Sequence, residues 1–207
     1  MIESSGGRVG LLGGTFDPIH AGHLAAAHVA RDCARLDRVI FVPAAQPPHR
    51  PPAVAPAPQR LEMCRLATAG EGRFAVSDVE LRRGGTSYTV DTLRDMRRLH
   101  PGGELFLILG WDAARLFPTW RRPDEVRALA SIVVVGRPGA GAPREADLEP
   151  LGLEGEGVVL CLEPTPDVSA SEIRRAVAAG ESIAGQVPDV VERYITANHL
   201  YAGKFRC

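Results

Sequence analysis

The sequence predicts an α/β protein whose mostly parallel sheet carries helices on both faces. Short β-branched or apolar runs alternate with helical patterns along the 207 residues, as in a chain of βαβ units. The first apolar run ends in two glycines and a polar turn directly before an Ala-rich stretch. Such a turn at the carboxyl end of a first strand, facing a helix N-terminus, is typical of a phosphate site.

The elements follow one another in a regular order. Strands are expected near Val9–Leu12, Val39–Val42, Phe74–Ser77, Leu105–Leu109, Ile132–Val135 and Val158–Leu162. Helices are expected near Leu24–Ala34, Gln59–Ala69, Val90–Leu99, Glu125–Ala130, Ser171–Ala179 and Asp189–Ala197.

Two segments interrupt this alternation. Pro43–Pro58 has seven prolines in sixteen residues, which predicts an extended loop. Gly136–Gly157 has six glycines and three prolines, which predicts a second surface loop. Strand and helix patterns resume directly after both, so we interpret residues 1–207 as one domain from which both loops are excursions.

The composition narrows the functional class. Lys+Arg 24 against Asp+Glu 25 gives a net charge of −1, so neither a nucleic-acid stripe nor a polybasic membrane anchor is indicated. The N-terminus lacks the apolar core of a signal peptide, and no apolar run approaches the length of a membrane helix. The four cysteines form no C-x-x-C pair, which favours a reduced, cytoplasmic protein with unpaired thiols.

The segment after the first strand carries the chemistry. Gly13 and Gly14 lack a Cβ atom, so the backbone there can approach a ligand closely and adopt positive φ. Pro18 restricts the turn before the helix. His20 and His23 are three positions apart and can share one face of the first helical turn.

Neither common nucleotide fingerprint, G-x-G-x-x-G or G-x-x-x-x-G-K-[ST], is present in this segment. Two imidazoles at a helix start instead suit a triphosphate, because each can donate hydrogen bonds to phosphate oxygens. A metal pair is the alternative for His-x-x-His, but no third Cys or His lies nearby and no acidic cluster flanks it, so we predict no protein-bound metal.

The string GGTFDPIHAGH closely resembles the signature of the nucleotidylyltransferase superfamily, which implies a Rossmann-like fold. That resemblance implies that Thr15 and His20 contact ATP phosphates and that His23 stabilises the α-phosphate as it is attacked. Val168–Arg174 resembles a second signature of the superfamily, with Ala170 in place of a serine. Ser169 or Ser171 can cap the helix that follows, and Arg174 supplies a charged fork for the β- and γ-phosphates.

Further motifs lie at Pro47-Pro48-His49-Arg50, Gly84–Leu93, Leu109–Ala113 with Trp120, Arg137-Pro138-Gly139, and Tyr194-Ile195 with Leu200-Tyr201. These motifs resemble those of the bacterial nicotinate-nucleotide adenylyltransferase family, so the resemblance extends from Val9 to Tyr201. Trp111 is larger than the residue usual there and is expected to crowd or line the pocket.

The resemblance implies two sets of binding residues beside the catalytic Thr15, His20, His23 and Arg174. ATP is expected at Gly13, Gly14, Thr15, Phe16, His20, Gly22, His23, Gly110, Asp112, Ser169, Ser171, Ile173 and Arg174. Nicotinate mononucleotide is expected at His49, Arg50, Tyr88, Thr89, Trp120 and Arg137. An indole such as Trp120 can stack on a pyridine ring, and backbone amides at Tyr88–Thr89 suit a carboxylate.

The implied reaction joins ATP and nicotinate mononucleotide into nicotinate adenine dinucleotide and pyrophosphate, in NAD biosynthesis. Mg²⁺ is expected as an ion held by the ATP phosphates, and a homo-oligomer is compatible with the sequence. Two alternatives stay open. One is an adenylyl- or cytidylyltransferase with another second substrate, such as phosphopantetheine, and the other is a nucleotide-binding module without turnover.

Overall fold

The computed structural model describes residues 7–48, 51–136 and 143–203. Its six strands form one parallel sheet in the order β3-β2-β1-β4-β5-β6. The strands are β1 (Arg8–Gly14), β2 (Arg38–Pro43), β3 (Phe74–Val76), β4 (Glu104–Gly110), β5 (Ser131–Val135) and β6 (Val158–Cys161). The strand order reverses between β1 and β4, and ligands of open parallel sheets bind at the carboxyl ends of the strands beside such a reversal.

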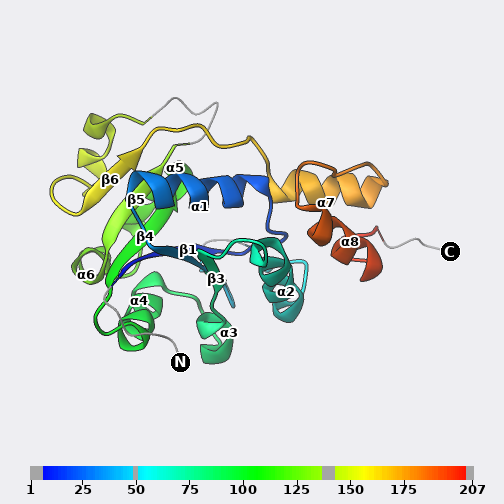
Figure 1. Cartoon of the computed structure of the whole chain (residues 1–207), viewed down its shortest axis with the longest axis horizontal. Coiled ribbons are helices and arrows are strands. Elements are labelled where there is room, and N and C mark those ends of the chain that lie inside the picture. The colour runs from blue at the N-terminus through cyan, green and yellow to red at the C-terminus, as the bar shows by residue number, and fades with distance from the viewer. Residues whose placement is uncertain (1–6, 49–50, 137–142, 204–207) are drawn as a thin grey trace.

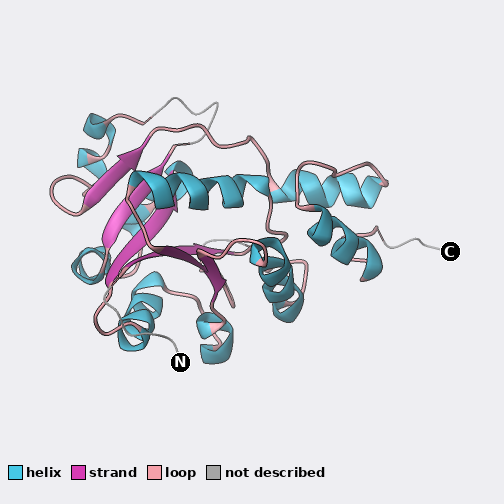
Figure 2. Ribbon diagram, viewed as in Figure 1, coloured by secondary structure: helices cyan, strands magenta, loops and turns pink. Residues whose placement is uncertain are grey.

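Helices cover both faces of the sheet (Figures 1 and 2). They are α1 (Ala21–Cys33), α2 (Ala57–Thr68), α3 (Val79–Arg83), α4 (Thr89–Leu99), α5 (Trp111–Arg115), α6 (Pro123–Leu129), α7 (Ala170–Ala179) and α8 (Asp189–Ala197). In Figure 1, α1 crosses one face, while α4 and α6 lie on the other. No helix within the described ranges is long and apolar enough to span a bilayer.

The strands are apolar throughout because both faces of the sheet are buried. Alternate side chains point to opposite faces, so each strand contributes to two separate cores. Leu12, Phe41 and Ile108 face the core under α1, and Leu11 and Ile40 face the core under α4 and α6. The sheet is therefore a rigid platform for the loops at its carboxyl edge.

Each predicted strand and helix is present, with ends that shift by a few residues. The additional elements are short: α3, α5, and the 3₁₀ turns η1 (Phe117–Thr119), η2 (Glu145–Asp147) and η3 (Glu149–Leu151). Elements of three to five residues have too few positions for an apolar period to be recognised.

The description of 136–157 as a surface loop is wrong for its second half. That half contains η2 and η3, and Leu148 and Leu153 are buried in the core under α4 and α6. The Pro-rich segment is also shorter than expected, because Pro43 ends β2 and α2 already begins at Ala57. Proline is well tolerated in a first helical turn, whose amides need no helical partner.

The expectation of unpaired thiols is wrong for two cysteines. A disulfide joins Cys33, at the end of α1, to Cys161, at the end of β6, across 128 positions of sequence. The spacing of the cysteines in the sequence does not predict this bond, because α1 and β6 come into contact only in the folded sheet. Cys64 is a buried free thiol, and burial raises its pKa.

Reducing the Cys33–Cys161 bond is expected to lower the free energy of unfolding by about 2–5 kcal/mol, because the bond restricts a long loop of the unfolded chain. Urea unfolding with and without reductant measures the change. Thiol titration of the denatured protein should count two fewer thiols before reduction than after it. Equal counts would contradict the bond, and Cys64→Ser is the control that leaves it intact.

Candidate functional site

The loop between β1 and α1 takes a tight turn at the carboxyl edge of the sheet. Gly14 is the last residue of β1, and a Cβ atom there would lie 2.9 Å from the Phe16 ring. Phe16 takes the left-handed backbone conformation, with φ of 49°. Neither Gly13 nor Gly14 uses the positive φ that glycine permits, because the left-handed residue of the loop is Phe16. A Cβ atom on Gly13 would meet nothing within 4 Å, so the backbone there is open to a ligand.

The two predicted histidines lie together at the start of α1. His20 is the N-cap residue, and its ring stacks on that of His23 with centroids 3.7 Å apart. The backbone N–H of His20 donates to Nδ1 of His23 at 3.3 Å. Because Nδ1 accepts, the proton of a neutral His23 is on Nε2, which can donate to an oxygen anion.

The start of α1 is electrostatically suited to an anion. Its first turn contains no acidic residue, so the partial positive charge of the helix N-terminus is not neutralised locally. Gly22 allows this turn to pack closely, since a Cβ atom would lie 3.2 Å from the His20 ring and 3.3 Å from the Pro166 carbonyl oxygen.

Residues near the end of the chain reach the same loop. Arg174 of α7 donates to the backbone carbonyl of Asp17 at 2.7 Å, so its guanidinium lies beside the predicted phosphate site. The hydroxyls of Ser169 and Ser171 bond to each other at 2.7 Å, and Ser169 makes no side-chain cap, unlike the prediction. Ile173 is fully buried and anchors α7 to the core under α1.

The end of β4 completes this edge of the sheet. Gly110 ends β4 and is the N-cap of α5, and a Cβ atom there would meet nothing within 4 Å. Asp112 is exposed in the first turn of α5. The indole of Trp111 is buried against the core under α4 and α6, so it packs inward instead of crowding the open edge.

A buried arginine supports the loop between β1 and α1, residues 15–20, which we name the phosphate loop after its predicted ligand. Arg60 is 1% exposed and donates to three backbone carbonyls, those of Thr15, Ala44 and Ala55. Burial lowers its pKa, and the charge of Asp17 opposes that change. Sequence reasoning missed this role, although Arg60 is three and four positions before the core residues Met63 and Cys64, on one face of α2.

Two of the residues predicted for the mononucleotide, Tyr88 and Thr89, lie at the start of α4. Tyr88 is the N-cap of α4, and the guanidinium of Arg121 lies 4.5 Å from the centre of its ring, in a cation–π contact. Trp120 is half-buried, with its ring 5.6 Å from that of Phe117. The predicted contacts His49, Arg50 and Arg137 lie outside the described residues.

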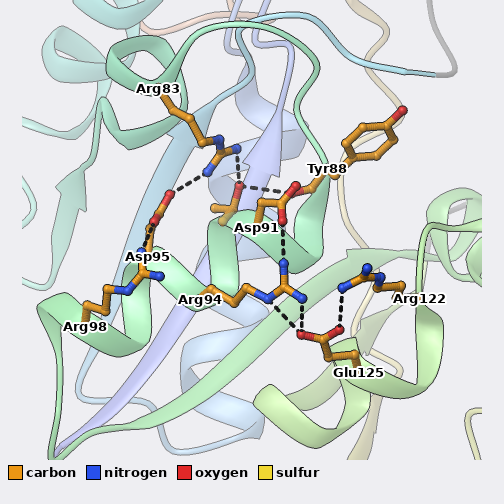
Figure 3. Close-up of polar contacts among 9 residues, drawn as sticks. Arg83, Tyr88, Asp91, Arg94, Asp95, Arg98, Arg122 and Glu125 are labelled. Atoms are coloured by element: carbon orange, nitrogen blue, oxygen red, sulfur yellow. Dashed lines mark hydrogen bonds and ion pairs between the residues drawn. The ribbon is translucent and has the colours of Figure 1, made fainter.

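Ion pairs on both sides hold α4 in place. Arg94 of α4 bonds to Asp91 at 2.8 Å and to Glu125 of α6 at 2.6 Å, while Arg83 of α3 bonds to Asp95 at 2.7 Å. Figure 3 shows that the Tyr88 ring points away from this network. The network therefore fixes the helix and leaves the Tyr88–Thr89 turn accessible.

A buried carboxyl lies behind that turn. Glu80 is 6% exposed and accepts a hydrogen bond from the Thr92 hydroxyl of α4. Burial raises the pKa of Glu80, against the opposing effects of Ser87, Thr92 and Arg83. Ser87 also pairs with the Pro-rich segment, since its Oγ accepts from the Ala45 amide at 2.9 Å.

Comparisons with known proteins agree with this geometry. A family model described as cytidylyltransferase-like matches residues 11–176. A Thermus thermophilus protein named "probable nicotinate-nucleotide adenylyltransferase" is 49% identical over 194 residues, 94% of this chain and 99% of that protein. A protein of the same name from Geobacter sp. is 41% identical over 214 residues, 94% of this chain and 98% of that protein.

A solved structure shows the same fold. The Plasmodium falciparum nicotinic acid mononucleotide adenylyltransferase complexed with NaAD has a TM-score of 0.76 and 18% identity, over 94% of this chain and 97% of that one. The fold and the phosphate loop define a nucleotidyl-transferring enzyme of the cytidylyltransferase-like family. Within it, the chain belongs to the nicotinate-nucleotide adenylyltransferase family, since its matches at 41–49% identity run nearly end to end.

Replacing Glu80 by Gln is expected to change how stability depends on pH. The pKa of Glu80 is raised in the folded protein, so the wild type loses stability as pH rises from the unfolded pKa through the folded one. The variant, which does not titrate there, should gain in free energy of unfolding relative to wild type from about pH 4 upwards. Urea unfolding across this range measures the difference. Half-exposed Glu62→Gln is the control. Equal slopes for wild type and Glu80→Gln would contradict the raised pKa of Glu80.

Proposed function

We propose that the protein transfers the adenylyl group of ATP to nicotinate mononucleotide, giving nicotinate adenine dinucleotide and pyrophosphate. The observation that carries the proposal is that His20 and His23 stack at the start of α1, whose first turn has no acidic residue, while Arg174 reaches the loop before it at the Asp17 carbonyl. It is supported by full-length similarity to proteins named for this activity.

In the proposed step, a phosphate oxygen of the mononucleotide attacks the α-phosphorus of ATP in line. A new P–O bond forms as the bond to pyrophosphate breaks, and no covalent enzyme intermediate arises. The Nε2–H group of His23 donates to the α-phosphate oxygens, on which charge accumulates in the transition state. Thr15 and His20 bind neighbouring phosphate oxygens, and Arg174 binds the β- and γ-phosphates that leave.

The open glycines and α7 complete the ATP side of the proposal. Gly13 and Gly110, which leave space at the ends of β1 and β4, let the nucleotide approach the backbone. Exposed Asp112 is proposed to accept a hydrogen bond from a ribose hydroxyl, and Ser169 and Ser171 are proposed to donate to phosphate oxygens. Four residues expected to bind ATP are proposed to act instead by shaping the loop and α7, because their own atoms are enclosed or closely packed. They are Gly14, Phe16, Gly22 and Ile173.

Mg²⁺ fits this site as an ion carried by the triphosphate. In the described part of the chain, no group of three His, Cys, Asp or Glu side chains is placed to hold a metal. Its ligands would be mainly substrate phosphate oxygens and water. When bound, the ion neutralises charge on the triphosphate.

The mononucleotide is proposed to bind between the start of α4 and Trp120. The indole stacks on the pyridine ring. The Thr89 amide binds the nicotinate carboxylate, joined by the Tyr88 amide once that group leaves the Thr86 carbonyl, to which it donates at 3.1 Å. His49, Arg50 and Arg137 are proposed to bind the rest of the mononucleotide, with Arg137 on its phosphate.

Because the proposed reaction consumes ATP, the cytoplasm is the compartment that we propose for it.

Replacing His23 by Ala is expected to lower kcat by at least about a hundredfold, because the lost hydrogen bond is made chiefly in the transition state. Pyrophosphate release at saturating substrates measures kcat. His28→Ala is the matched control, since that residue is on the same helix but pairs with Glu71 and packs on Phe74. A change confined to KM in His23→Ala would contradict the proposed role.

Pyrophosphate release with ATP, Mg²⁺ and a panel of second substrates tests the reaction itself. We expect nicotinate mononucleotide to be used in strong preference to nicotinamide mononucleotide and phosphopantetheine, because only the first has the carboxylate that the Tyr88–Thr89 amides bind. Equal use of the acid and the amide would remove that argument for selectivity. No release with any pair, while ATP still binds, would support a binding module without turnover.

A further inference from the structure

Asp17 occupies an unusual position in the phosphate loop. It is 4% exposed and lies between the left-handed Phe16 and Pro18. Its Oδ2 accepts from the backbone N–H of Val54 at 2.7 Å, and its Oδ1 accepts from that of Ala55 at 3.0 Å. One carboxylate therefore binds two successive amides of the Pro-rich segment, thirty-seven and thirty-eight positions away.

We propose that Asp17 is a positioning residue that couples the two substrate loops of the reaction. It joins the loop that carries the proposed ATP-binding residues to Val54 and Ala55 of the Pro-rich segment, so that a shift of one loop on ligand binding is transmitted to the other. This inference rests on the proposed function, because that function assigns the two loops to different substrates.

The contacts around Asp17 form a closed ring between the loops. Arg60 donates to the Thr15 carbonyl on one side and to the Ala55 carbonyl on the other. Ala55 is therefore bound at both its N–H, by Asp17, and its C=O, by Arg60. The other end of the Pro-rich segment is also fixed, since the Ala44 amide donates to the Gly14 carbonyl at 2.8 Å. A displacement of either loop must strain these bonds together.

Asp17 also orients a residue proposed to bind phosphate. The Arg174 guanidinium donates to the Asp17 carbonyl at 2.7 Å and lies 3.8 Å from its Oδ2. The Asp17 carboxylate therefore lies beside the Arg174 cation and also binds, through Ala55, the Pro-rich segment that is proposed to bind the mononucleotide. Oδ1 accepts a further hydrogen bond, at 2.9 Å, from the buried hydroxyl of Tyr201.

Asp17→Asn tests the coupling with little change of volume. The asparagine keeps one acceptor oxygen, but its NH₂ group must face one of the two backbone N–H groups that donated to the carboxylate, so that one hydrogen bond is lost. Asp37→Asn is the matched control. Asp37 also accepts a hydrogen bond from a backbone N–H, that of Arg8 at 2.7 Å, but it lies at the amino end of β1, the end opposite the phosphate loop. Tyr201→Phe removes only one of the donors to Asp17.

The readout is the ratio of two dissociation constants for nicotinate mononucleotide, without and with saturating α,β-methylene ATP. In the wild type we expect binding to tighten by about fivefold or more when the ATP analogue is present. Asp17→Asn should bring this ratio to within about twofold of one and lower kcat by about tenfold or more. Asp37→Asn should keep the wild-type ratio even if its thermal midpoint falls, which separates coupling from stability.

Two results would overturn the coupling proposal: a wild-type ratio of one, or a folded Asp17→Asn that keeps the wild-type ratio. If Asp17→Asn does not fold, Tyr201→Phe decides, since a reduced ratio supports the proposal and an unchanged ratio overturns it. Failure of the proposed function is recognised separately, because wild-type enzyme would then release no pyrophosphate from ATP and nicotinate mononucleotide.

Discussion

The phosphate loop keeps its shape because two buried charges of opposite sign bind backbone groups on both sides of it. Asp17 accepts amide protons, and Arg60 donates to carbonyls, so each satisfies main-chain groups that burial would otherwise leave without water. Neither charge is tolerated inside a protein alone. The loop geometry, the orientation of Arg174 and the anchoring of the Pro-rich segment all depend on this arrangement.

The sheet and the phosphate motif could be predicted because their signals are local. Parallel strands buried on both faces, such as Ile132–Val135, are continuous apolar runs, and Gly13 to His23 are contiguous in sequence. The strand order could not be deduced in this way, but the placement of β1 beside β4 brings Gly13 and Gly110 to one edge.

The features that could not be predicted from the sequence depend on tertiary contacts. The Cys33–Cys161 bond, the burial of Leu148 and Leu153, and the inward direction of Arg60 depend on elements far apart along the chain. The left-handed residue of the loop could not be located from the sequence for a related reason. Glycine permits positive φ, but packing of the Phe16 ring beside Gly14 and His23 selects Phe16 for it.

The hydrogen bond from Tyr201 to Asp17 joins residues 184 positions apart. A chain is synthesised from its N-terminus, so β1 and the phosphate loop leave the ribosome long before Tyr201 does. Until then, the Asp17 carboxylate lacks one of its donors, and α7 has yet to bring Arg174 to the loop. The phosphate loop is therefore translated before the residues that complete its contacts, and it reaches its final form late in folding.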